Sequence, residues 1–200
     1  VAGNYAYVAG GSELRITDIS NPSTPIIAGG VDILNYIQAV SVAGNYAYVA
    51  GGSSGLQVVD ISNPSTPFIA SIIGSSAYDV QVAGNYAYVA EGTSGLKIID
   101  ISSPVAPFIA ATIDITGGTE GVHVAGNYAY IAAGDSGLQV VDISNPAAPF
   151  ITASVDTPDF ALGVYAAASY AYVADREAGL QVINWQKAID NYKTIQAYYH

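Results

Sequence analysis

The sequence contains no cysteine and no methionine, and it is poor in basic residues. Without cysteine there is no disulfide framework, no thiolate metal site and no thiol nucleophile. Only 5 Lys and Arg residues stand against 16 Asp and Glu residues, which gives a formal net charge of −11. Such a charge repels phosphate backbones and anionic lipid headgroups, so we expect no nucleic-acid binding and no binding to a membrane surface.

Long apolar runs are absent as well, although 51% of the residues are hydrophobic and only 10% are charged. No stretch approaches the roughly 18 consecutive apolar residues of a membrane helix, and no basic-then-apolar segment opens the chain. We therefore predict no membrane insertion and no retained signal peptide. The low charge also excludes a disordered tail and a charged coiled coil. Because position 1 is Val rather than Met, we expect the chain to be processed or cut from something longer.

What the sequence does contain is an internal repeat. Its first phrase is Val-Ala-Gly-Asn-Tyr-Ala-Tyr-Val-Ala, and its second is Leu-Gln-Val-Val-Asp-Ile-Ser-Asn-Pro. The first phrase begins at Val1, Val42, Val82, Val124 and, in a degraded form, Ala167, a spacing of 40 to 42 residues over the intact copies. We therefore predict a single domain over residues 1–200, built from repeats at about 1–41, 42–81, 82–123, 124–165 and 166–200.

Each copy predicts four short strands. In the second copy these are Ala39–Ala43, Tyr46–Ala50, Leu56–Ser62 and Phe68–Ile73, which alternate or are rich in β-branched residues. Gly-Asn makes the first reversal a tight hairpin, and Asn-Pro stops the third strand. Four antiparallel strands in about 40 residues are typical of a propeller blade. We predict an all-β fold, a β-propeller of about five four-stranded blades, with an open β-solenoid as the alternative.

The two ends of the repeat depart from this pattern. The first blade is incomplete, because Val1 falls at the end of its innermost strand, and upstream sequence, the C-terminal tail or a neighbouring molecule could complete it. In the last copy Asn184 and Trp185 replace the repeated Asp-Ile, and the Asn-Pro loop is missing. An ungapped alignment still predicts a fourth strand over Tyr192–Tyr199. The alternative is a short helix lined by Trp185, Ala188, Ile189, Tyr192 and Ile195.

Tyr-Ala-Tyr-Val-Ala, then Gly-Leu-Gln-Val-Val-Asp-Ile-Ser-Asn-Pro, then Pro-Phe-Ile-Ala resembles the LVIVD repeat family. The resemblance covers nearly the whole chain, four copies well and the fifth partly. It implies β-propeller repeats of bacterial and archaeal secreted or cell-surface proteins, and so an extracellular or cell-surface location. It carries over no catalytic residue, and we expect no enzyme activity.

Residues that recur in every copy are expected to build the scaffold. Each repeated aspartate precedes Ile-Ser, and we predict that it accepts backbone N–H bonds within its own turn, with a metal-binding ring as the alternative. The repeated tyrosines, such as Tyr46 and Tyr48, are predicted to pack between blades, with sugar stacking as the alternative. The aspartates are Asp18, Asp60, Asp100 and Asp142.

The loops between the second and third strands, and those between successive copies, differ from copy to copy. In a propeller these loops share one face, and loops on a rigid scaffold carry recognition. The innermost strands add unlike residues at matched positions, Ser41, Gln81, His123 and Tyr165. The candidate ligand-binding residues of this variable face are Tyr36, Gln38, Tyr78, Asp79, Glu120, His123, Phe160 and Tyr165.

Acidic residues of the variable face permit two further chemistries. Asp79, Glu120 and Asp159 would form the acid pair of a glycoside hydrolase if they converged, or hold Ca²⁺ through oxygen ligands. They do not share a repeat position and no Asp-x-Asp loop is present, so we expect solvated acids, no catalytic residue and no cofactor, with Ca²⁺ left open. Neither His123 nor His200 has a second histidine at zinc-ligand spacing.

Three functions follow from these patterns. The favoured one is a structural or adhesive module that self-associates with other protein subunits, as in a surface assembly or filament. The second is a lectin-like propeller that binds glycans through the variable face. The third, which the residues favour least, is a hydrolase.

Overall fold

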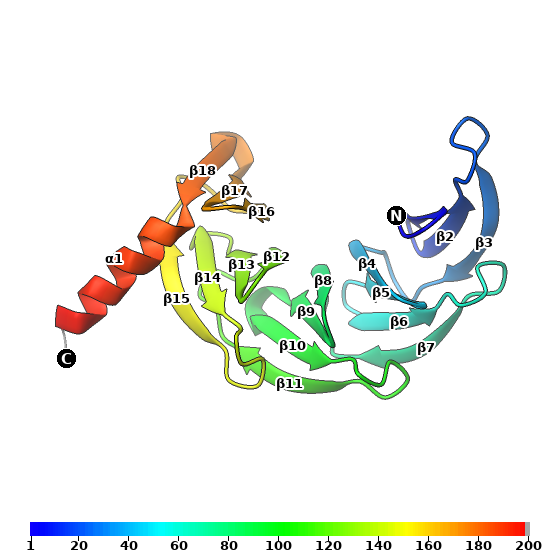
Figure 1. Cartoon of the computed structure of the whole chain (residues 1–200), viewed down its shortest axis with the longest axis horizontal. Helices are drawn as coiled ribbons and strands as arrows, with labels where there is room; N and C mark the ends of the chain where they lie inside the picture. Colours follow the sequence, from blue (N-terminus) through cyan, green and yellow to red (C-terminus); the bar gives the residue numbers. More distant parts are fainter. Residues whose placement is uncertain (199–200) are drawn as a thin grey trace. The chain divides into compact units, whose positions relative to one another are not determined.

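The structure is a computed structural model that describes residues 1–198, with side chains described to Tyr192. Its strands form five antiparallel sheets, each made from consecutive strands (Figure 1). The first sheet contains β1 (Tyr5–Gly10), β2 (Glu13–Asp18) and β3 (Ile26–Asp32). The second contains β4 (Ala39–Ala43), β5 (Tyr46–Ala50), β6 (Leu56–Asp60) and β7 (Phe68–Ile73).

The remaining sheets repeat this order. The third contains β8 (Asp79–Ala83), β9 (Tyr86–Ala90), β10 (Leu96–Asp100) and β11 (Phe108–Ile113). The fourth contains β12 (Gly121–Ala125), β13 (Tyr128–Ala132), β14 (Leu138–Asp142) and β15 (Phe150–Val155). The fifth contains β16 (Gly163–Ala167), β17 (Tyr170–Ala174) and β18 (Leu180–Asn184), and α1 (Trp185–Tyr198) follows it. Single 3₁₀ turns occur at Gly92–Ser94 and Arg176–Ala178.

The strands predicted for the second copy are confirmed, with one change at the end of β6. That strand stops at Asp60 instead of Ser62, because the Asp60 carboxylate accepts the Ser62 backbone N–H at 2.9 Å and turns the chain. The Gly44-Asn45 hairpin joins β4 to β5 in the register Ala43 to Tyr46. Gly44 has a φ of +56°, which glycine adopts without steric cost at the first central position of such a turn.

The prediction of four strands in every sheet holds for the second, third and fourth sheets. The first sheet has three strands and lacks the one that would precede β1, as the sequence predicts. The last sheet also has three, and the strand predicted over 192–199 is wrong, since α1 occupies the described part of that range. Tyr199 lies outside the described residues.

The last repeat forms a helix because Asn184 and Trp185, which replace the repeated Asp-Ile, both stabilise a helix here. The Asn184 side chain accepts the Lys187 backbone N–H at 2.9 Å, which is an N-cap bond. The residues Trp185, Ala188, Ile189 and Tyr192 then recur at helical spacing and pack on a core of the fourth and fifth sheets. The helix lies against β15 and β17 (Figure 1).

Contacts divide the chain into two compact units. One is Val1–Val89 with Asp100–Phe108, and the other is Ala90–Ile99 with the chain from Ile109 onward. In the first unit, Leu14 and Ile16 of β2 form one core with Ala47, Val49 and Val59 of the second sheet. In the second unit, residues of β13 and β14 form a core with residues of β16 and β17.

β3, β7, β11 and β15 take the fourth strand position of the repeat. β3 and β7 are each covered by the turn that follows the third-position strand of the next repeat. A Cβ added to Gly29 of β3 would lie 2.3 Å from the Pro64 carbonyl oxygen, so only glycine fits there. The Ser71 hydroxyl of β7 donates to the Pro104 carbonyl oxygen at 2.7 Å. On β15 the equivalent residue is Ala153, which shares a core with Ile189. The helix α1 therefore covers β15 where a turn covers β3 and β7.

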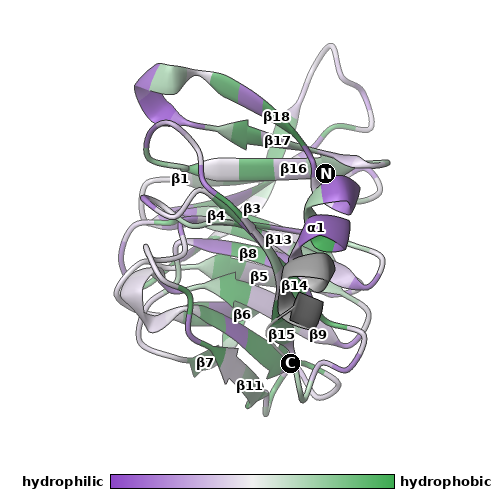
Figure 2. Ribbon diagram, turned by 90° about the vertical axis from the view of Figure 1, so that its left-hand side faces the viewer, coloured by the Kyte–Doolittle hydropathy of each residue, from purple (hydrophilic) through white to green (hydrophobic). Residues whose placement is uncertain are grey.

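Figure 2 colours each residue by its hydropathy, and the hydrophobic colour marks parts of several strands, among them β6 and β17. No helix among the described residues has both the length and the apolar character that a membrane crossing requires.

Candidate interaction surface

The repeated aspartates act within their own turns. The carboxylates of Asp18, Asp60, Asp100 and Asp142 each accept the backbone N–H of the serine two residues later, at 2.8–2.9 Å. This confirms the scaffold prediction. The Ser20 N–H and then its side chain lower the pKa of Asp18, and the Ser102 hydroxyl and then its N–H lower the pKa of Asp100. Among the described residues, no three His, Cys, Asp or Glu side chains gather closely enough to hold a metal ion.

The second tyrosine of the second, third and fourth repeats packs inside the protein, as predicted, whereas Tyr7 of the first repeat is only partly buried. Tyr48, Tyr88 and Tyr130 are buried, with 1–3% of their surface exposed. Burial raises the pKa of these three phenols, and the preceding tyrosine of the same strand adds to the rise. A buried ring offers no face to a sugar, so these tyrosines belong to the scaffold.

Backbone hydrogen bonds join the two sets of variable loops. Gly52 exchanges N–H···O bonds with Ala77 at 2.8 and 3.0 Å, and the same two-way link joins Gly92 to Thr119 and Gly134 to Ala161. Each glycine has a positive φ, of 51–57°. The loop inside one sheet therefore pairs with the loop that leads to the next, so the two loop sets share one end of the sheets.

Four candidate residues of the first unit lie around Gly52. A Cβ on Gly52 would lie 3.7 Å from the Tyr36 carbonyl oxygen and 3.8 Å from the Gln38 amide nitrogen. Tyr78 follows Ala77, the bridge partner of Gly52, and Asp79 follows Tyr78. The Tyr36 and Tyr78 side chains are 68% and 44% exposed. Two exposed tyrosines and an amide therefore flank one glycine loop, while the Asp79 carboxylate accepts the Val80 N–H at 2.8 Å.

The candidate residues of the second unit divide into a ring pair and two others. The His123 and Tyr165 rings lie 4.6 Å apart, tilted by 53°, and Tyr165 is 57% exposed. Phe160 lies between Gly134 and the Arg176 guanidinium, whose Cζ is 4.4 Å from the ring centre. Glu120 is half-buried and its N–H bonds to the Ala132 carbonyl oxygen at 2.9 Å. Among these four candidates, His123 and Tyr165 therefore form a ring pair, and Tyr165 is its exposed member.

Sequence reasoning missed a set of buried polar links beneath these loops. The Gln57 amide exchanges hydrogen bonds with the backbone of Leu34 at 2.9 and 3.1 Å. At the same repeat position Lys97 pairs with the buried Glu91 carboxylate. The buried Asp175 carboxylate accepts the Thr157 hydroxyl at 2.7 Å and the Asp159 N–H at 3.1 Å. Glu91 and Asp175 occupy matched positions at the start of their loops, which a comparison of the copies could have found.

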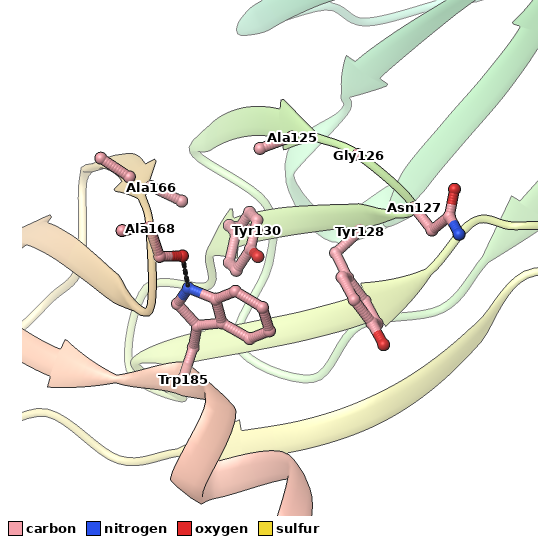
Figure 3. A pocket seen from close by; sticks show the side chains of 9 residues that line it. Ala125, Gly126, Asn127, Tyr128, Tyr130, Ala166, Ala168 and Trp185 are labelled. Atoms are coloured by element: carbon pink, nitrogen blue, oxygen red, sulfur yellow. Dashed lines mark hydrogen bonds between the residues drawn. The ribbon is translucent and has the colours of Figure 1, made fainter.

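An aromatic pocket of about 280 Å³ lies where α1 begins (Figure 3). Tyr128 and Tyr130 of β13 form one side of it, and the ring centre of Trp185 is 5.4 Å from each of theirs. The Trp185 indole N–H donates to the Ala168 carbonyl oxygen at 3.1 Å. These contacts fix α1 to the hairpin between β16 and β17.

The last sheet exposes a face that other sheets bury. Leu180 and Val182 of β18 are 65% and 57% exposed. We call these two residues the front face. Their counterparts in the first sheet, Leu14 and Ile16, pack against the next sheet along the chain. All their counterparts in the other four sheets are fully buried, namely Leu14, Leu56, Leu96, Leu138, Ile16, Val58, Ile98 and Val140.

The first sheet exposes the opposite face. Val8 of β1 is 46% exposed, and Ala6 is half-buried. We call these two residues the back face. Their counterparts in the second sheet, Ala47 and Val49, are fully buried against Leu14 and Ile16. The two ends of the chain therefore expose the two halves of a contact that the chain makes internally.

A sequence model of the LVIVD repeat matches five segments, residues 1–33, 36–73, 74–114, 116–157 and 161–184. Together these segments cover most of the 200 residues. The chain belongs to the LVIVD-repeat family. The Leu-Gln-Val-Val-Asp phrase of this LVIVD protein is β6, and its relatives are β2, β10, β14 and β18, so the sequence that identifies the family also carries the front face. No curated protein matches the chain in sequence.

Solved structures show that the fold is propeller-like. This LVIVD protein aligns with the β-propeller domain of Cps50 (Swd1) from Myceliophteria thermophila at a TM-score of 0.67 and 12% identity, over 87% of this chain and 60% of that one. A functionally unknown protein from Desulfotomaculum acetoxidans aligns at 0.72 and 14% identity, over 90% and 64%. The computationally designed Ika8 protein aligns at 0.75 and 12% identity, over 92% and 56%. The LVIVD chain thus spans little more than half the length of Ika8.

Proposed function

We propose that this LVIVD-repeat protein is a non-catalytic interaction module that associates with further copies of itself, front face to back face, in a secreted or cell-surface assembly. The family and the propeller-like fold support a repeat protein that acts through contacts with other molecules. The location outside the cell is part of the proposal and rests on the family resemblance.

The exposed front face is the observation that carries the proposal. Leu180 and Val182 lie on a regular strand, so no loop rearrangement hides them. Full burial of a Leu or Val side chain is worth about 1.5–3 kcal/mol.

A second copy fits this face because its back face has the same residue types that the chain packs against Leu14 and Ile16, the counterparts of the front face in the first sheet. Leu14 and Ile16 share a core with Ala47 and Val49. The back face, Ala6 and Val8, has the same residue types on the same strand of the repeat. A head-to-tail contact would continue an interface that the chain forms between its own first and second sheets.

Complementation between two variants tests this contact. Val182→Asp removes the front face and Val8→Asp removes the back face, so we expect each variant alone to be monomeric at every concentration. Mixed in equal amounts, the two still supply one intact front and one intact back, and we expect dimers of one copy of each. Analytical ultracentrifugation with one variant fluorescently labelled measures the stoichiometry.

Val105→Asp is the matched control, because Val105 is 63% exposed in a turn that belongs to neither face. We expect it to assemble like the wild type. Assembly of Val182→Asp alone, or no association in the mixture of variants while the wild type assembles, would contradict the proposed contact.

A lectin-like function is the second candidate, and the exposed tyrosines around Gly52 favour it. Tyr36 and Tyr78 offer stacking faces, and the Gln38 amide offers hydrogen bonds, as sugar recognition requires. A glycan array probed with the wild type and with Tyr36→Ala and Tyr78→Ala tests this function. Tyr170→Ala is the control, since Tyr170 is 45% exposed outside these loops. A glycan bound equally by all four proteins would exclude this loop as its site.

A further inference from the structure

The outer edge of β18 has no partner strand in the described chain. β2, β6, β10, β14 and β18 take the third strand position of the repeat. The first four each pair with a strand on both sides, whereas β18 pairs with β17 and ends its sheet. After Asn184 the chain leaves the sheet as α1 and packs on β15 and β17 (Figure 1). One row of backbone N–H and C=O groups of β18 is therefore open.

The chain itself shows how such an edge is filled. Three described strand pairs, β2 with β3, β6 with β7 and β14 with β15, share one antiparallel register and one irregularity at the same place. In the last of these pairs Leu138 lies opposite Val155 and Val140 opposite Ala153. β18 carries Leu180 and Val182 at those positions, so the same register is open to a strand of the same type.

Nothing in β18 protects this edge. The strand reads Leu-Gln-Val-Ile-Asn, with neither proline nor a charged side chain. Exposed edge strands of natural proteins usually carry a lysine, a proline or a bulge that prevents pairing with another chain. An unprotected edge on a sheet whose face is also exposed is a site for strand addition.

We propose that the outer edge of β18 binds an extended segment of another protein as an added fourth strand, antiparallel to β18 and in the register of β15 on β14. The chemistry of the segment follows from the strands that fill this position elsewhere. β7, β11 and β15 begin with Phe-Ile, carry no charge, and have Ser or Ala at the fourth residue. The partner is thus an uncharged strand with a large apolar residue three positions before a small one. This site is separate from the head-to-tail contact.

A fluorescent, C-terminally amidated peptide of residues 150–155, Phe-Ile-Thr-Ala-Ser-Val, is the direct probe. It is titrated by anisotropy into the Val8→Asp variant, so that no head-to-tail contact competes, and into the wild type. We expect saturable binding and slowed hydrogen exchange at the amides of Leu180–Asn184. A scrambled peptide of the same composition should bind at least tenfold more weakly.

Two N-methylated peptides separate strand addition from apolar adsorption. Methylation of alternate residues removes the N–H groups on one edge of a strand and leaves those on the other edge. We expect one methylated peptide to bind like the parent and the other to lose at least tenfold in affinity. Equal binding of both, or no binding of the parent, would overturn the proposal. Protection of the β18 amides in peptide-free dimers of Val8→Asp would assign the edge to a second copy instead.

Discussion

A single residue decides whether the backbone of each tight hairpin turn is strained. The glycine of the tight turn has φ near +57° in four copies, at Gly3, Gly44, Gly84 and Gly126. In the last copy Ala168 takes the same place, with φ of +50°. A left-handed conformation costs a residue with a Cβ roughly 1–2 kcal/mol. The last hairpin is therefore strained where the others are not.

Ala168→Gly should raise the free energy of unfolding by about 1 kcal/mol, because it relieves this strain and keeps the carbonyl that binds Trp185. Urea denaturation measures the change. Gly126→Ala is the converse control, since its new Cβ would meet nothing within 4 Å and only the backbone conformation changes. We expect it to lose a similar amount. A less stable Ala168→Gly variant would show that the turn is not strained.

Asp100 should make the protein sensitive to acid. The Ser102 hydroxyl and N–H lower its pKa in the folded state, so the unfolded chain binds this proton more readily. The stabilisation is therefore complete above the unfolded pKa of about 3.9 and is lost as the pH falls through the folded value. Ser102→Ala should raise the pKa of Asp100 toward that of a free aspartate.

Carboxyl-carbon NMR titration measures this shift. Ser103→Ala is the control, because the contact that Ser103 makes with Ala106 uses its backbone carbonyl only. We expect it to leave the pKa of Asp100 unchanged. An equal effect of both substitutions would remove the assigned cause.

At the scale of elements, α1 ends the described part of the repeat and contributes to its stability. Ile189 is fully buried in a core that includes Val140 and Ala153. Ile189→Ala should lower the free energy of unfolding by about 2–5 kcal/mol, whereas Gln186→Ala, on the exposed side, should change it little. Trp185 is the one tryptophan, so its fluorescence reports the docking of α1 directly. Equal stability of the two variants would mean that α1 is not docked.

The sequence predicts elements well where local chemistry repeats. Alternation and the Gly-Asn turn predict β4 and β5 to the residue. The fourth strand of the last sheet fails, because the alignment extends the repeat past Asn184. Only the N-cap bond of Asn184 and the packing of Trp185 and Ile189 decide for a helix, and those depend on contacts that a sequence does not show.

The candidate loops show the same limit. The sequence predicts that the variable loops share an end of the sheets, and backbone bonds such as Gly52 to Ala77 join them. It does not predict that Phe160 is packed between Gly134 and Arg176, since that depends on how two loops fold together. It also cannot separate Leu180 from Leu56, which stand in near-identical phrases yet are 65% and 0% exposed.

At the scale of the whole molecule, the first and the last described sheets each expose residues whose counterparts in other sheets are buried. The last sheet exposes Leu180 and Val182, and the first exposes Val8. A net charge of −11 opposes unspecific clustering of copies, so association depends on a contact that is shaped for it. The proposed head-to-tail contact is such a contact, and it requires no new chemistry beyond what the chain uses internally.

The mass of the wild-type chain across a concentration series, measured by multi-angle light scattering, tests this claim most directly. The head-to-tail contact predicts a mean mass that rises smoothly with concentration above the mass of one chain, and that falls back on dilution. A mass of one chain at every concentration would contradict it.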